Sequence, residues 1–205
     1  SSRFPDPVLQ QVEHFNNPGI TANDAFKPVT RYFDRITRPE QIISSLQQAV
    51  QVMLDPADCG PACISLSQDI QGEVYDYPEE FFKEKIHTIR RSRPDDFQIK
   101  EAAELIKKSK KPIIISGGGV FYSDATKELS DFAKKHNIPV TQTVMGYSTL
   151  KKDHSHYLGV IGGLGGKAAN NLSKETDTAI AIGTKLADFT TGSWANFENP
   201  DFKLV

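Results

Sequence analysis

The sequence predicts an α/β fold in which a parallel sheet carries helices on both faces. The first observation is an apolar run, Ile113–Ser116, which is typical of a strand buried on both faces. The second is the recurrence of such runs at Ile138–Thr143 and Thr178–Ile182, with helical patterns between them. The third is glycine at strand ends, Gly117–Gly119 and Gly183, where α/β folds place their ligands.

Residues 98–205 are expected to form this domain. Asp95 or Asp96 can cap its first helix, which carries Ile99, Ala102, Ala103 and Ile106. A second helix is expected from about Ser123, with Leu129, Phe132 and Ala133 facing inward, and a third near Lys167–Ser173. The core should contain Ile113, Ile114, Ile115, Val140, Ile180 and Ile182.

Residues 1–72 offer less sheet. Helices are expected at Pro7–Phe15 and from Pro39, the second with Ile42, Leu46, Ala49, Val50 and Met53 at helical spacing. Ala62–Leu66 is the one convincing strand, and Thr21–Thr37 is expected to be irregular. We therefore interpret residues 1–72 as the carboxyl-terminal part of a larger domain.

The chain begins without methionine and stops in Phe202–Val205, which resembles the start of a strand. We expect it to be an internal segment of a longer protein. Residues 73–97 are rich in Tyr, Pro, Glu and basic residues and are expected to be a surface linker. Its arginine cluster, Arg90–Arg93, could contact phosphates, but a solvated linker is the simpler interpretation.

The composition is that of an ordinary globular protein of 205 residues, with 38% hydrophobic and 24% charged residues. A net charge of −2 gives no electrostatic reason to expect nucleic acid or an anionic membrane as partner. No apolar run approaches the roughly 20 residues that span a bilayer, and no signal peptide is visible. Cys59 and Cys63 lack zinc-site spacing, so free thiols and a cytoplasmic location are expected.

No single motif identifies a reaction. Gly117–Gly119 lacks the last glycine of a dinucleotide fingerprint, and no acid follows Thr143, so a structural turn and a nucleotide site both stay open. Gly162–Gly166 precedes a helix and could hold an anion or serve as a flexible turn. His154 and His156 could ligate a metal, yet no complete ligand set surrounds them.

The order of several motifs is more specific than any one of them. The motifs are Lys111-Pro112 with Gly117–Gly119, Ile138-Pro139-Val140 with Thr143 and Gly146, His154 with Leu158-Gly159, Gly162 with Gly165 and Ala169-Asn170, Asp177, and Gly183-Thr184-Lys185 with Asp188. This order resembles the central domain of the thiamine-diphosphate enzymes related to acetohydroxyacid synthase. Gly60-Pro61 and Gln68–Gln71 are similar to the end of that family's pyrimidine-binding domain.

Three stretches narrow the resemblance. Asp24–Ile36, Asp69–Pro78 and Asp188–Trp194 are similar to the family's cyclic-diketone hydrolases of myo-inositol catabolism. The resemblance implies a small cyclic diketone as the substrate of the parent enzyme, and a homo-oligomer. An acetohydroxyacid-synthase-like enzyme and a non-catalytic nucleotide-binding module are the alternatives.

The resemblance also implies cofactors. The parent enzyme would use thiamine diphosphate and Mg²⁺, held by a Gly-Asp-Gly segment that this sequence lacks, and no catalytic residue or metal ligand is assigned here. Some relatives bind FAD or ADP at the central domain. Lysine at 185, where the flavin-binding synthases have arginine, argues against FAD. A vestigial nucleotide pocket is expected from Gly117, Gly118, Gly119, Thr143, Gly162, Gly183, Lys185 and Asp188.

Overall fold

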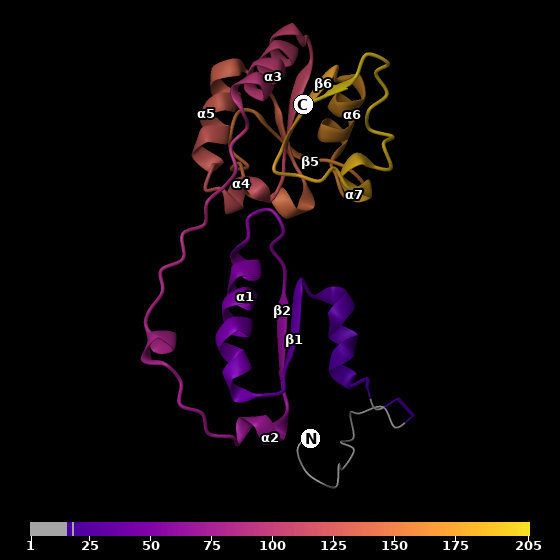
Figure 1. Cartoon of the computed structure of the whole chain (residues 1–205). Helices are drawn as coiled ribbons and strands as arrows, with labels where there is room; N and C mark the ends of the chain where they lie inside the picture. Colours follow the sequence, from indigo (N-terminus) through magenta and orange to yellow (C-terminus); the bar gives the residue numbers. More distant parts are fainter. Residues whose placement is uncertain (1–15, 18) are drawn as a thin grey trace. The chain divides into compact units, whose positions relative to one another are not determined.

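The structure, a computed structural model, describes residues 16, 17 and 19–205 (Figure 1). The chain divides into two compact units, Ser1–Ser92 and Arg93–Val205, which are described separately. The helix expected at Pro7–Phe15 lies outside the described residues. Within the described part, no helix has the length and apolar character needed to cross a bilayer.

The second unit contains the predicted parallel sheet. Its strands are β3 (Pro112–Ser116), β4 (Val140–Gln142), β5 (Tyr157–Val160), β6 (Thr178–Ile182) and β7 (Lys203–Leu204). All neighbours pair in parallel in the order β5-β4-β3-β6-β7. The chain therefore runs from the central strand β3 toward one edge and returns through β6 toward the other.

Helices cover both faces of this sheet, which confirms the predicted fold class (Figure 1). On one face, α3 (Asp96–Lys108) and α5 (Thr126–His136) pack against a cluster centred on Ile114 and Val140. On the other, Ala169 of α6 (Lys167–Glu175) packs with Ile113 and Ile115. Alternation of Ile113, Ile114 and Ile115 between the two clusters follows from the two-residue period of a strand.

The core prediction is confirmed for five of its six residues. Ile113, Ile114, Ile115 and Val140 are completely buried, and Ile180 is 7% exposed. Ile182 is the exception, because it is only partly buried and packs at the margin of the Ile114 cluster. It is the last residue of β6 and so lies at the carboxyl edge of the sheet.

The elements around the strands differ from the prediction in two places, and a third expectation is confirmed. A short helix, α4 (Gly119–Tyr122), begins within the glycines, so the main helix α5 starts later than Ser123. Strand β5 was not predicted, since it is short and contains Gly159 at a φ of 99°, next to a register shift against β4. The expected strand at the chain end is confirmed as β7, where Val205 N–H also bonds to Ala179.

The first unit is a βαβ arrangement. Strands β1 (Tyr32–Ile36) and β2 (Ala62–Leu66) pair in parallel, and α1 (Ile42–Leu54) connects them after the short 3₁₀ helix η2 (Pro39–Gln41). The expectation that Thr21–Thr37 is irregular was wrong, because this stretch forms the 3₁₀ helix η1 (Ala22–Val29) and then β1. The short helix α2 (Gln68–Gln71) follows β2.

A partly buried carboxylate explains why β1 escaped prediction. Asp34 interrupts the strand's apolar pattern, but its oxygens accept hydrogen bonds from the Ser45 hydroxyl, the Gln41 amide and the Arg35 backbone N–H. Burial alone would raise the pKa of Asp34, and these hydrogen bonds outweigh it and lower the pKa. The carboxylate therefore ties β1 to the start of α1.

The beginning of the expected linker is ordered against the first unit. Tyr77 stacks on Phe81, with ring centroids 5.6 Å apart, and its hydroxyl donates to the Pro39 carbonyl at 3.2 Å. Phe81 belongs to the 3₁₀ helix η3 (Glu79–Phe82). Residues 83–95 carry no helix or strand and are exposed, so Arg90–Arg93 lie in a solvated segment.

Asp177, just before β6, joins two turns of the second unit. It accepts hydrogen bonds from the Ser109 hydroxyl and from the backbone N–H groups of Lys110 and Lys111. Burial opposes the charged form, yet these hydrogen bonds outweigh it and lower the pKa of Asp177. The carboxylate thus fixes the α3–β3 turn to the start of β6.

Replacing Asp177 by alanine is expected to lower the free energy of unfolding at pH 7 by about 2 kcal/mol, the scale of lost charge-assisted hydrogen bonds. The pKa of Asp177 is lower in the folded state than in the unfolded chain. The stability that the carboxylate contributes is therefore complete above its unfolded pKa of about 3.9. It disappears as the pH falls through the folded pKa of Asp177, so the difference in stability between variant and wild type should shrink progressively as the pH falls below about 3.9. Guanidinium unfolding followed by the fluorescence of Trp194, the chain's one tryptophan, measures this in the second unit.

The control is Glu175→Ala, which removes an exposed carboxylate that pairs with Lys111. Exposed ion pairs contribute little, so its stability should change far less. Equal effects of the two substitutions at pH 7 would contradict the role assigned to Asp177.

Candidate ligand site at the carboxyl edge of the sheet

A pocket of about 380 Å³ lies where β3, β4 and β6 end. Its lining comes from the turns after these three strands and from α7 (Asp188–Thr191). The chain leaves β3 toward β4 and leaves β6 toward β7, so the pocket lies at the topological switch point of the sheet. Ligands of open α/β sheets bind at such a point.

The glycines are explained first by close backbone contact. Gly117 N–H donates to the Ile182 carbonyl and Gly119 N–H to the Gly183 carbonyl, at 2.9 and 3.0 Å. A Cβ on Gly117 would lie 2.2 Å from the Gly183 oxygen, and one on Gly119 would lie 2.6 Å from the Gly183 Cα. Gly183 itself has a φ of 60°. These three glycines let the turns after β3 and β6 touch.

A buried polar network shapes the opposite wall. Gln142 of β4, 1% exposed, donates to the Leu150 carbonyl at 2.9 Å and accepts from the Ser148 N–H at 3.3 Å. Its Nε2 also donates to the hydroxyl of Thr149, which contacts the Ser116 hydroxyl at the end of β3. The network therefore fixes the segment 143–150 over the sheet edge.

Thr143 lines the pocket, but its hydroxyl is already engaged. It accepts a hydrogen bond from the Gly146 N–H at 3.0 Å and so caps the 3₁₀ helix η4 (Val144–Gly146). This turn presents the largely exposed side chains of Val144 and Met145 to the pocket. Phe189, 67% exposed, lines it from α7.

Lys185 is the one charged residue among those that line the pocket. Its side chain is exposed and makes no ion pair with another described residue. Its neighbour Leu186 has a φ of 49°, a conformation that costs energy for a residue with a side chain. The pocket therefore combines apolar walls with a single cation, which suits a flat or apolar group carrying one negative charge.

Five of the eight residues expected in a nucleotide pocket line this one: Gly118, Gly119, Thr143, Gly183 and Lys185. Three do not. Gly117 is buried against Gly183, and Gly162, at a φ of 95°, packs against the Phe189 carbonyl and bonds to Asn170. Asp188 accepts from the Ser193 hydroxyl at 2.7 Å and so closes the turn after α7. Nucleotide binding stays a prediction.

Sequence reasoning missed the other six lining residues, which are mostly apolar: Val144, Met145, Thr184, Ala187, Phe189 and Thr190. Val144 and Met145 directly follow the predicted strand Ile138–Thr143, so their position beyond the strand end was an available signal. Phe189 offered no comparable signal, because α7 is a four-residue helix in an irregular segment.

The residues that the structure describes do not fit a magnesium diphosphate site. The described residues contain no group of three or more His, Cys, Asp or Glu side chains that could hold a metal ion. The histidine pair is engaged elsewhere: His154 bonds to Ser130 and the His156 N–H, and His156 bonds to Asn137 and Ser155. Cys59 and Cys63 are free thiols.

Comparison with known proteins agrees with this architecture. Residues 99–205 match the family described as thiamine pyrophosphate enzyme, central domain. The whole chain is 50% identical to 3D-(3,5/4)-trihydroxycyclohexane-1,2-dione hydrolases of Clostridium perfringens and Bacillus subtilis, and 49% identical to that of Bacillus licheniformis. The chain spans about a third, 32%, of the length of these relatives. It belongs to the thiamine pyrophosphate enzymes and contains the central domain of that family.

Proposed function

We propose that this chain is the middle part of a thiamine-diphosphate-dependent hydrolase that opens the ring of trihydroxycyclohexane-1,2-dione. The reaction would hydrolyse a C–C bond of the cyclic diketone and give 5-deoxy-glucuronate in myo-inositol degradation. The observation that carries the proposal is identity near 50% across all 205 residues to relatives named for this substrate. A cytoplasmic, homo-oligomeric enzyme is part of the same proposal.

Thiamine diphosphate, when bound, stabilises the carbanion that C–C cleavage releases. The cofactor and its Mg²⁺ would be held by parts of the parent enzyme beyond this segment. The chain's own contribution would be the rigid sheet edge with its pocket, and we assign no catalytic residue to it. Residues 1–72 would complete the pyrimidine-binding domain, residues 73–97 would link the domains, and residues 98–205 would form the central domain.

The pocket at the sheet edge would then be a vestigial nucleotide site. Lys185 offers a point charge and lacks the planar fork with which arginine stacks on rings and binds oxygens in pairs. FAD is therefore the less suitable occupant, and ADP the better candidate. If the parent enzyme lacks catalysis, micromolar ADP or FAD binding would favour the alternative of a non-catalytic nucleotide-binding module.

The test is an assay of the full-length protein, with thiamine diphosphate and Mg²⁺, on the cyclic diketone and on pyruvate. Diketone turnover without acetolactate formation is the expected result. Turnover of pyruvate alone would replace the proposal by an acetohydroxyacid-synthase-like function. The isolated 205-residue chain serves as control. Calorimetric titration with thiamine diphosphate and Mg²⁺ should show no saturable heat, because none of its described residues form a diphosphate–metal site.

A further inference from the structure

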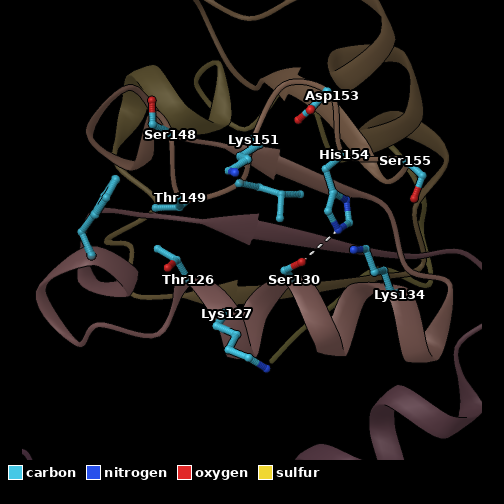
Figure 2. Close-up of a pocket in the computed structure, with 12 residues that line it drawn as sticks. Thr126, Lys127, Ser130, Lys134, Ser148, Thr149, Lys151, Asp153, His154 and Ser155 are labelled. Carbon is cyan, nitrogen blue, oxygen red and sulfur yellow. Dashed lines mark hydrogen bonds between the residues drawn. The ribbon is translucent and has the colours of Figure 1, made fainter.

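A second, larger pocket of about 710 Å³ lies between α5 and the segment 148–155 (Figure 2). Its volume is within the usual range for small-molecule sites. It does not include the glycine turns at the sheet edge, so it is distinct from the pocket described above. Three lysines line it, Lys127, Lys134 and Lys151, against the one carboxylate of Asp153.

Two of these lysines have ammonium groups available to a ligand. Lys127 is held by Asp131 at 2.5 Å, and Figure 2 shows its side chain pointing away from the cavity. Lys134 and Lys151 form no ion pair with any other described residue, and their nitrogens point toward the cavity (Figure 2). Asp153 is exposed and lies on the opposite side of the cavity from Ser130 (Figure 2).

His154 orients the hydroxyl group of Ser130, which also lines this cavity. His154 Nδ1 accepts a hydrogen bond from the His156 N–H at 3.1 Å, so this nitrogen carries no proton. Burial, together with the charges of Lys134 and His156, lowers the pKa of His154, which keeps the ring neutral at pH 7. The remaining proton is therefore on Nε2, which donates to Ser130 Oγ at 3.1 Å. The Ser130 hydroxyl is left to donate its own proton.

Ser130 and Lys134 are four residues apart on α5, so they share one face of that helix. Across the cavity stand Lys151 and the largely buried side chain of Leu150, and the half-exposed Phe121 supplies apolar surface to the lining. The site thus offers two ammonium groups and one hydroxyl donor beside apolar surface. A phosphate monoester carries up to two charges and three acceptor oxygens, which matches these three donors, whereas a carboxylate has one charge and two oxygens.

We propose that this pocket binds the phosphate group of a small phosphorylated metabolite through Lys134, Lys151 and the Ser130 hydroxyl. The apolar part of the lining would contact the organic body of the ligand. His154 is a positioning residue, which acts through Ser130.

The test is an NMR titration of the 205-residue chain at constant ionic strength with inorganic phosphate, glucose 6-phosphate, glucose and acetate. Saturable shifts are expected for the amides of Ser130, Lys134 and Lys151 with the two phosphates, and none with glucose. Acetate should bind about tenfold more weakly or not at all. Tighter binding of glucose 6-phosphate than of inorganic phosphate would identify the ester as the ligand class, and equal affinity would overturn the assignment of an organic body.

Matched variants give the decisive comparison. Lys134→Gln and Lys151→Gln should each weaken phosphate binding about tenfold, the scale of one charged hydrogen bond. Lys135→Gln, the exposed neighbour that does not line the pocket, should change the affinity less than about twofold. Equal losses in Lys134→Gln and Lys135→Gln, or non-saturable shifts spread over all lysines, would overturn the site.

Discussion

Replacing Gly117 by alanine is expected to destabilise the second unit by about 3 kcal/mol or more, the upper range for inserting an atom into a packed site. The added Cβ would lie 2.2 Å from the Gly183 carbonyl oxygen and 2.6 Å from the Thr184 side chain. The turns after β3 and β6 meet here through their backbones, which are joined by the hydrogen bond from the Gly117 N–H to the Ile182 carbonyl. Relief of the clash requires β3 and β6 to separate where the candidate pocket forms.

Gly166→Ala is the matched control for this substitution. A Cβ on Gly166 meets no atom within 4 Å, and its φ of −79° is open to any residue. Guanidinium unfolding, followed by Trp194 fluorescence, should show a midpoint close to the wild type for Gly166→Ala and a large drop for Gly117→Ala. Similar midpoints for the two variants would refute the close contact between the turns.

The sheet was predictable because its strands carry their signal locally. Ile113–Ile115 is an unbroken apolar run, and the glycines after it mark the strand end. The reason for these glycines was not predictable, since it depends on contact with Gly183, a partner more than sixty residues away in the chain. A run of glycines is equally compatible with a structural turn and with a ligand-binding loop. Here it serves as both, because Gly117 packs against Gly183 and Gly118 lines a pocket.

In the first unit, by contrast, strand β1 could not be predicted from its local sequence. Strand β1 contains Asp34 and Arg35, which break the alternation expected of a strand. The strand is possible because the Asp34 carboxylate has partners on η2 and α1, and such partners are set by tertiary structure. The pocket proposed to bind phosphate could not be predicted from the sequence either. Ser130, Lys134 and Lys151 come together only through the packing of α5 against the segment 148–155.

Gln142 is a buried amide whose two ends have different partners. Its Nε2 donates to the Leu150 carbonyl and the Thr149 hydroxyl, while its Oε1 accepts from the Ser148 N–H. Gln142→Leu leaves these groups without partners and should cost about 2–3 kcal/mol at any pH between 5 and 7. This apolar variant provides the pH-independent reference for the next substitution.

Gln142→Glu keeps the shape of the side chain but places an oxygen 2.9 Å from the Leu150 carbonyl and buries a charge. At pH 7 the expected loss of stability is about 3–5 kcal/mol, the range for an uncompensated buried charge. The pKa of the introduced carboxyl is raised in the folded state above its unfolded value of about 4.3. The folded variant therefore binds a proton first, and its stability relative to wild type should rise as the pH falls from 7 toward 5.

Between pH 7 and 5, the stability of Gln142→Glu relative to wild type should increase by up to about 1.4 kcal/mol for each pH unit, because folding of the variant binds one proton. The protonated carboxyl can then donate to the Leu150 carbonyl in place of the lost amide. Trp194-detected unfolding at pH 7, 6 and 5, expressed as the difference from wild type, measures the slope. A penalty independent of pH, as expected for Gln142→Leu, would show that this side chain is solvated and that it does not hold the 143–150 wall of the candidate site.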